Sequence, residues 1–104
     1  MAKVHSLKIW PAFYEAVLYG YKKAELRKSD RDFNCGDYIV LREWWDNKYS
    51  GNKVIVKITH ILPVEGMIEG GFDWVVLSIS PINSNDTAAL IDAVFEEAED
   101  EHSY

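Results

Sequence analysis

The sequence lacks the features that would place it in a membrane, on a secretory route or in a disulfide framework. Its 104 residues include one cysteine, Cys35, so no internal disulfide can form. No apolar run is long enough to span a bilayer, and the first residues lack the basic and apolar regions of a signal peptide. These absences predict a cytoplasmic protein that has no membrane partner.

Positive charge is missing from one part of the chain. The sequence has 17 acidic and 11 basic residues, and residues 82–104 hold seven of the acids but no Lys or Arg. Residues 1–81 therefore carry 10 acids against 11 bases, a formal charge of +1 against −6 for the whole chain. An acidic chain argues against strong non-specific binding to nucleic acid, but a near-neutral body leaves binding at one basic site open.

The length and the apolar content predict one folded body with a single core. The chain is 48% hydrophobic and contains four Trp, six Tyr and four Phe, which excludes a disordered protein. We expect residues 1–81 to form this body and residues 82–104 to form an acidic helical tail.

Hydrophobic periodicity predicts short strands around one early helix. Aromatic and aliphatic residues recur at helical spacing after Pro11 and stop before Gly20; they are Trp10, Phe13, Tyr14, Val17 and Leu18. Alternating or β-forming runs predict strands over residues 5–9, 23–27, 38–44, 54–62 and 74–80, with connections over 46–52 and 63–71. Residues 86–98 show a second helical stripe with acids on the opposite face. The resulting fold class is α+β, a small and mostly antiparallel barrel with an N-terminal helix and a C-terminal acidic amphipathic helix.

The segment from Gly20 to Asp37 concentrates charge of both signs between the helix and a strand. It holds five basic and three acidic side chains before the Gly36-Asp37 pair: Lys22, Lys23, Arg27, Lys28, Arg31, Glu25, Asp30 and Asp32. Cationic side chains bind phosphate oxygens, and carboxylates accept hydrogen bonds from the amino groups of bases. The alternative is a solvated strand and turn whose ion pairs contribute about 0.2–1 kcal/mol each.

The residues of this segment and its neighbours resemble the ASCH superfamily of PUA-like barrels, especially its small bacterial and phage proteins. The similar pattern is His5-x-Leu7-Lys8, then Gly20-x-Lys22-Lys23-x-Glu25-x-Arg27-Lys28-x-Asp30-Arg31-x-Phe33-x-x-Gly36-Asp37, then Leu41-x-Glu43, Tyr49-x-Gly51 and Ile58-Thr59. The resemblance spans about residues 5–80. It implies a PUA-like barrel with a cleft beside the first helix, and a role in binding RNA or modified nucleosides.

Some members of that superfamily resemble small amidohydrolases that act on acylated cytidine, and others resemble ribonucleases. Lys22 occupies the position of the proposed catalytic Lys of the amidohydrolases, but Glu25 stands where they have a Thr. A carboxylate does not replace a hydroxyl nucleophile, so the resemblance implies the cleft more strongly than the reaction. Lys22 and Glu25 are the catalytic candidates if the protein is an enzyme.

The expected ligand-binding residues combine the charged segment with aromatic side chains. They are His5, Lys8, Lys22, Glu25, Arg27, Arg31, Trp44 and Tyr49. Trp44 or Tyr49 would stack on a base, whereas Trp10, Phe13 and Tyr14 are expected to pack on the core and Trp74 to fill the barrel. Asp37 is expected to bond backbone N–H groups at the start of a strand. His5 and His60 have no third ligand at a suitable spacing, so we expect neither a metal nor another cofactor.

Three functions compete on this evidence. The first is binding of RNA, another single-stranded nucleic acid or a modified nucleoside. The second is a small hydrolase that uses the same cleft. The third is a protein-interaction module whose partner binds the acidic helix over residues 86–98.

Overall fold

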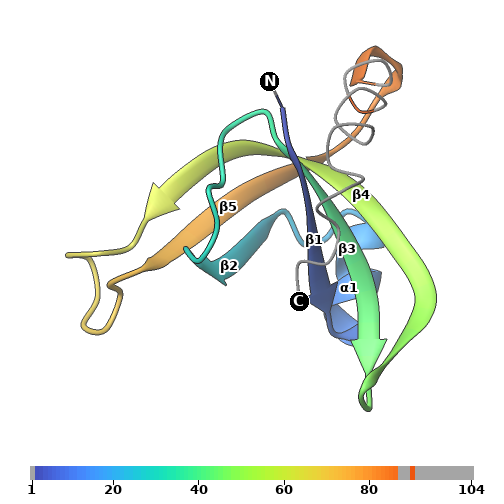
Figure 1. The fold of residues 1–104 in the computed structure, drawn as a ribbon, viewed down its shortest axis with the longest axis horizontal. Helices are drawn as coiled ribbons and strands as arrows, with labels where there is room; N and C mark the ends of the chain where they lie inside the picture. The colour runs from blue at the N-terminus through green and yellow to red at the C-terminus, as the bar shows by residue number, and fades with distance from the viewer. Residues whose placement is uncertain (1, 87–89, 91–104) are drawn as a thin grey trace.

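Five strands form one curled sheet, a half-barrel, in the computed structural model, which describes residues 2–86 and 90 (Figure 1). The strands are β1 (Val4–Ile9), β2 (Ala24–Lys28), β3 (Tyr38–Trp45), β4 (Lys48–Pro63) and β5 (Trp74–Pro81), and one helix, α1 (Pro11–Leu18), joins β1 to β2. The strand order is β1-β3-β4-β5-β2, so β1 and β2 are the two edges of the sheet. The expected α+β class with a small barrel-like sheet is confirmed at this level.

The long strand β4 gives the sheet its curl. Its first part pairs with β3 and its second part with β5, and the register shifts between Ile58 and His60. Such a bulge bends a strand and increases its twist. The pairing of β1 with β3 is parallel, whereas the other three pairings are antiparallel, so the sheet is mixed but mostly antiparallel, as expected.

One aliphatic cluster fills the inner face of this sheet. Every second residue of β1, β3, β5 and the middle of β4 points inward, as the period of a strand requires. The buried members of the cluster are Leu7, Ile9, Val17, Ile39, Leu41, Val56, Ile58, Val75, Leu77 and Ile79.

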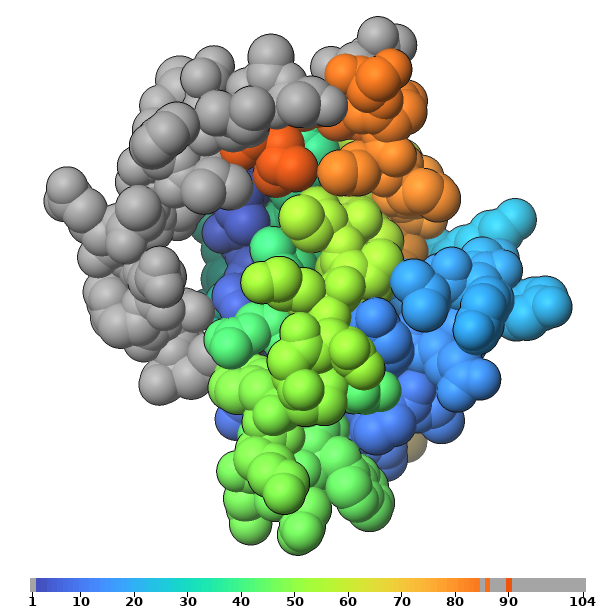
Figure 2. Space-filling view, turned by 90° about the vertical axis from the view of Figure 1, so that its right-hand side faces the viewer, coloured from blue at the N-terminus to red at the C-terminus, as the bar shows by residue number. Residues whose placement is uncertain are grey.

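Helix α1 begins and ends where the sequence predicts. Pro11 occupies its first turn, and Gly20, with φ of 81°, follows its end in a conformation that favours glycine. The expected packing on the core is confirmed for Tyr14, which lies partly buried against it, but is wrong for Trp10 and Phe13, which are each about half exposed. Figure 2 shows α1, in blue, beside the hairpin of β3 and β4, in green.

Two other expectations need correction. The connection expected over residues 46–52 is a two-residue turn at Asp46 and Asn47, whose φ values of 53° and 63° fit the tight hairpin type that follows strand twist. Trp74 does not fill the barrel but is 38% exposed.

Asp86 holds the end of the described body against β3 and β4. The short helix η1 (Ser84–Asp86) places its carboxylate 3.2 Å from the Tyr38 hydroxyl and 3.0 Å from Lys57 Nζ, and Asn83 N–H donates to the other oxygen. The Asn83 N–H and then Lys57 lower the pKa of Asp86, while Asp86 raises the pKa of Lys57, and burial raises that of Tyr38.

The helix expected over residues 86–98 lies, apart from Asp86 and Leu90, outside the described residues. The division into a body and an acidic tail therefore stays a prediction. In the described part of the chain, α1 is far too short to cross a membrane and no other helix is long enough.

Candidate functional site

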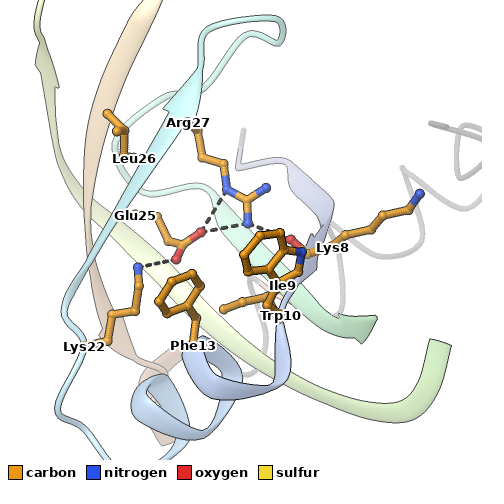
Figure 3. Close-up of a pocket in the computed structure, with 8 residues that line it drawn as sticks. All are labelled: Lys8, Ile9, Trp10, Phe13, Lys22, Glu25, Leu26 and Arg27. Atoms are coloured by element: carbon orange, nitrogen blue, oxygen red, sulfur yellow. Dashed lines mark hydrogen bonds and ion pairs between the residues drawn. The ribbon is translucent and has the colours of Figure 1, made fainter. Parts of the chain in front are cut away.

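A cleft of about 440 Å³ opens between helix α1 and the edge strand β2 (Figure 3). Residues from the end of β1, the first turn of α1, the loop after α1 and β2 contribute to its walls. They are Lys8, Ile9, Trp10, Phe13, Lys22, Glu25, Leu26 and Arg27. The cleft thus lies where the two edges of the sheet approach each other, a place that no single segment of the sequence defines.

A buried carboxylate forms the polar centre of the cleft. Glu25 is 4% exposed, and Lys22 Nζ donates to its Oε1. Arg27 Nε donates to Oε2 at 2.8 Å, and Arg27 Nη2 forms an ion pair with the same oxygen at 2.7 Å. A buried charge requires such pairing. The cluster still reaches water, because the side chains of Lys22 and Arg27 are each 24% exposed. The three charged groups leave one formal positive charge in the cleft.

The strand β2 directs Glu25 and Arg27 inward. Glu25 and Arg27 alternate with Ala24, Leu26 and Lys28 along the strand, as the sequence predicts. The apolar Leu26 nevertheless points away from the cleft and is 58% exposed (Figure 3). An edge strand can carry this inverted pattern because its inner face borders the cleft instead of the aliphatic core.

Two arginine side chains connect β1 to β2 and to the segment that follows β2. Arg27 Nη2 donates to the Lys8 carbonyl of β1 at 2.7 Å, and Arg31 Nη1 donates to the Ser6 carbonyl of the same strand at 3.2 Å. These bonds satisfy edge carbonyls that no backbone ladder reaches. Arg27 therefore holds the cleft together and lines it at the same time.

An aromatic wall lies beside the charged centre. The rings of Trp10 and Phe13 are nearly parallel, with an angle of 5° and centroids 6.1 Å apart. Trp45 meets Trp10 edge to face at 6.5 Å, and Lys22 Nζ lies 5.8 Å from the Phe13 ring centroid. The sequence analysis missed Trp10 and Phe13 as site residues. The sequence did offer one signal for them, because both lie at the start of a helix that begins at Pro11.

Four of the expected ligand-binding residues, Lys8, Lys22, Glu25 and Arg27, line the cleft together. Lys8 does so mainly with its backbone, because its ammonium group points away from the other cations in Figure 3 and lies 4.6 Å from the Trp44 ring centroid.

The other four expected residues are not part of the cleft lining. Trp44 and Tyr49 are register partners in the β3–β4 hairpin, and Arg42 stacks on Tyr49 at 3.8 Å. Arg31 braces β1 as described above. His5 is buried, bonds Asp37 Oδ2 at 2.8 Å and touches the Phe33 ring edge to face.

Asp37 has the structural role that the sequence predicts. Its carboxylate accepts backbone N–H bonds from Lys3 and Asn34, both at 3.0 Å, in addition to the bond with His5. These contacts fix the loop before β3 to the start of β1.

Comparisons with known proteins place the chain in a family. Residues 4–79 match the model of DUF3850, described as a domain of unknown function, and the chain belongs to this family. A relative that is 38% identical over 77 residues is the "Uncharacterized 12.9 kDa protein in GpA 3'region" of Escherichia phage P2. The match covers 74% of this chain and 68% of the phage protein.

A solved structure supports the fold alone. The hypothetical protein PH0355 matches with a TM-score of 0.54 and 18% identity, over 76% of this chain and 99% of that one. The narrower resemblance to the ASCH superfamily stays a prediction.

Proposed function

We propose that this chain is an ASCH-type, PUA-like domain that binds single-stranded RNA or a nucleotide-like ligand in the cleft between α1 and β2. One observation carries the proposal: exposed, mutually parallel rings of Trp10 and Phe13 lie beside the Lys22–Glu25–Arg27 cluster.

The charged centre suits an anionic group. Glu25 occupies Nε and Nη2 of Arg27, and within residues 2–86 and 90 no hydrogen bond involves Nη1 of the same side chain. Phosphate oxygens bind well to guanidinium N–H groups that are already oriented. Because both Glu25 oxygens accept from cations, we assign Glu25 the role of orienting Lys22 and Arg27.

The aromatic wall suits a base. An unstacked base has two open faces, and stacking on an aromatic side chain contributes about 1–3 kcal/mol per base. Duplexes do not expose these faces, so the arrangement favours single strands or free nucleotides. This ligand class uses both halves of the cleft at once.

Fluorescence anisotropy of short labelled single-stranded RNA and DNA tests the proposal. Replacing Trp10 with Ala is expected to weaken binding about 5- to 150-fold, which corresponds to the loss of one stacked base. Trp74→Ala is the matched control, because Trp74 is a partly exposed indole outside the cleft lining. Equal affinity in wild type and Trp10→Ala would contradict the proposal.

The salt dependence of binding tests the charged half. Lys22→Ala and Arg27→Ala should each reduce the slope of log affinity against log salt by about 0.7, the value for one lost phosphate contact on a single strand. Lys48→Ala, at the exposed β3–β4 turn, should leave the slope unchanged. An unchanged slope in both cleft variants would remove the phosphate contact from the proposal.

A hydrolase in the same cleft is the second candidate, supported by the direct contact between the Lys22 amine and the buried Glu25 carboxylate. An amine and a carboxylate in contact can exchange a proton during general acid–base catalysis. Turnover of an acylated nucleoside or of RNA that is lost in Lys22→Ala and in Glu25→Gln, with both variants folded, would favour this candidate. The third candidate, a partner bound through residues 86–98, stays a prediction outside the described residues.

A further inference from the structure

A row of apolar side chains crosses the outer face of the sheet on three neighbouring strands, β4, β5 and the edge strand β2. Leu26 of β2 and Leu62 of β4 are both register partners of Val76, which lies between them on β5. Register partners share a face of the sheet, so all three side chains lie on the side opposite the buried Leu77. Leu26 and Leu62 are exposed, and Trp74 extends the row two residues further along β5.

The connection between β4 and β5 continues this apolar surface. Met67, Ile68 and Phe72 are each more than 60% exposed, and Figure 1 shows their segment extending from the sheet at the left. We call the full set the outer patch: Leu26, Leu62, Met67, Ile68, Phe72 and Trp74.

The backbone of this connection is fixed by its own contacts. Val64 is buried, its carbonyl accepts from Met67 N–H at 3.0 Å, and its N–H donates to the Trp74 carbonyl at 3.1 Å. A Cβ at Gly71 would lie 2.6 Å from the Val64 carbonyl oxygen, so this close approach requires glycine. The loop therefore buries Val64 and Gly71 while it presents larger side chains to solvent, and little ordering is left for a partner to impose.

Acidic residues border the patch along the β4–β5 connection. Glu65, Glu69 and Asp73 alternate with its apolar residues along the connection, and Lys28, the register partner of Trp74, is the basic residue nearest to it in the sheet. Exposed Met and aromatic side chains within a polar border are typical of protein interfaces. We propose that the outer patch binds a partner protein through an apolar surface bordered by Lys or Arg.

Charge decides between this partner and two other occupants. A second copy of the chain would place Glu65, Glu69 and Asp73 opposite the same three acids across a twofold axis. Residues 82–104 carry seven acids and no Lys or Arg, so they would meet the same repulsion. A basic partner gains attraction at the border and burial at the centre.

Anisotropy with two model peptides on the full-length protein tests the proposal. The first probe is a labelled amphipathic helical peptide of Leu and Lys, and the second replaces each Lys with Glu. Wild type is expected to bind the Lys peptide and not the Glu peptide. Phe72→Ser and Met67→Ser should each weaken Lys-peptide binding at least about tenfold, and Tyr19→Ser, an equally exposed position after α1, should not. Glu65→Lys combined with Glu69→Lys should invert the preference.

Four results would overturn the proposal. If the Lys peptide does not bind, or if both peptides bind equally, the patch does not recognise a basic partner. Unchanged binding in Phe72→Ser and Met67→Ser would locate the peptide on another acidic surface. A dimer of wild type in sedimentation equilibrium that dissociates in Phe72→Ser would make a second copy the occupant. These readouts do not involve Lys22 or Arg27, so they are independent of the nucleic-acid proposal.

Discussion

Glu25 and Asp37 are both buried carboxylates, yet they organise their surroundings differently. Asp37 is 2% exposed, and its partners are two backbone N–H groups and the buried His5. Glu25 is 4% exposed, but its partners are the long side chains of Lys22 and Arg27, which reach the solvent of the cleft. The first arrangement closes a loop, and the second presents cations.

The difference shows that the partners of a buried acid decide whether it serves the fold or a ligand site. A carboxylate whose partners are backbone groups stabilises one chain conformation and has nothing to offer a ligand. A carboxylate that orients partly exposed cations leaves some of their N–H groups for another anion. Variants of the two acids should therefore affect stability and binding in different proportions.

The largest effect is expected for Asp37→Ala. The change leaves two part-buried backbone N–H groups and the buried His5 without their acceptor, which should lower the free energy of unfolding by about 3–5 kcal/mol. Urea denaturation measures this loss, and Asp32→Ala, which removes an exposed carboxylate, should leave the urea midpoint unchanged. RNA affinity of the folded fraction should equal that of wild type. A loss of affinity in that fraction would show that Asp37 also shapes the cleft.

Glu25→Gln should reduce stability less but binding more. The neutral amide keeps the shape of the side chain and loses the charge that both cations share, at a cost of about 1–3 kcal/mol in unfolding free energy. Affinity for single-stranded RNA should fall about tenfold, because Lys22 and Arg27 lose their fixed orientation. Glu15→Gln on the exposed face of α1 is the control for both measurements. A loss of stability with unchanged RNA affinity would show that Glu25, like Asp37, has only a structural role.

Arg27→Lys and Arg31→Lys form a matched pair that separates bracing from binding. Each replacement keeps the charge and removes a guanidinium bond to a β1 carbonyl, so each should lower the unfolding free energy by about 0.5–1.5 kcal/mol. Only Arg27 lines the cleft, so RNA affinity should fall severalfold in Arg27→Lys and stay unchanged in Arg31→Lys. Equal affinities in the two variants would contradict a ligand contact by Arg27.

The smallest effect concerns Asp86, and it is lost in acid. Its pKa lies below the ordinary value of 3.8 because Asn83 N–H and Lys57 stabilise the carboxylate. The unfolded state therefore takes up the proton first as the pH falls, so the stabilisation is present above the ordinary pKa and is lost below it. Urea midpoints of wild type and Asp86→Asn should differ near neutral pH and converge towards about pH 2–3. A constant difference over that range would exclude the charge of Asp86 as its cause.

Local patterns in the sequence were sufficient for most of the elements. The runs of β-forming residues from residue 38 and from residue 74 predicted β3 and β5, and Pro11 and Gly20 marked both ends of α1. The connection between β3 and β4 was predicted but made too long, although Asp46-Asn47 is a sequence that tight hairpins favour. The expectation ran over residues 46–52, whereas β4 begins at Lys48, and Gly51, with a positive φ of 97°, belongs to the strand.

The candidate site was predictable in part, because it depends on contacts between distant segments. Lys22, Glu25 and Arg27 lie within six residues of one another, so their charge pattern identified them. Trp10 joins them only because α1 packs across the end of the sheet, and its helical spacing with Val17 wrongly suggested burial.

The sequence by itself determined the periodicity of each strand, the limits of the helix and the local grouping of charges, since these follow from neighbouring residues. The tertiary structure decided which face of each element is buried. Glu25 points inward and Leu26 outward because β2 became an edge strand opposite β1, and Arg27 reaches the Lys8 carbonyl, 19 positions away, for the same reason. The position of a strand in the sheet is a property of the whole chain, and no local pattern contains it.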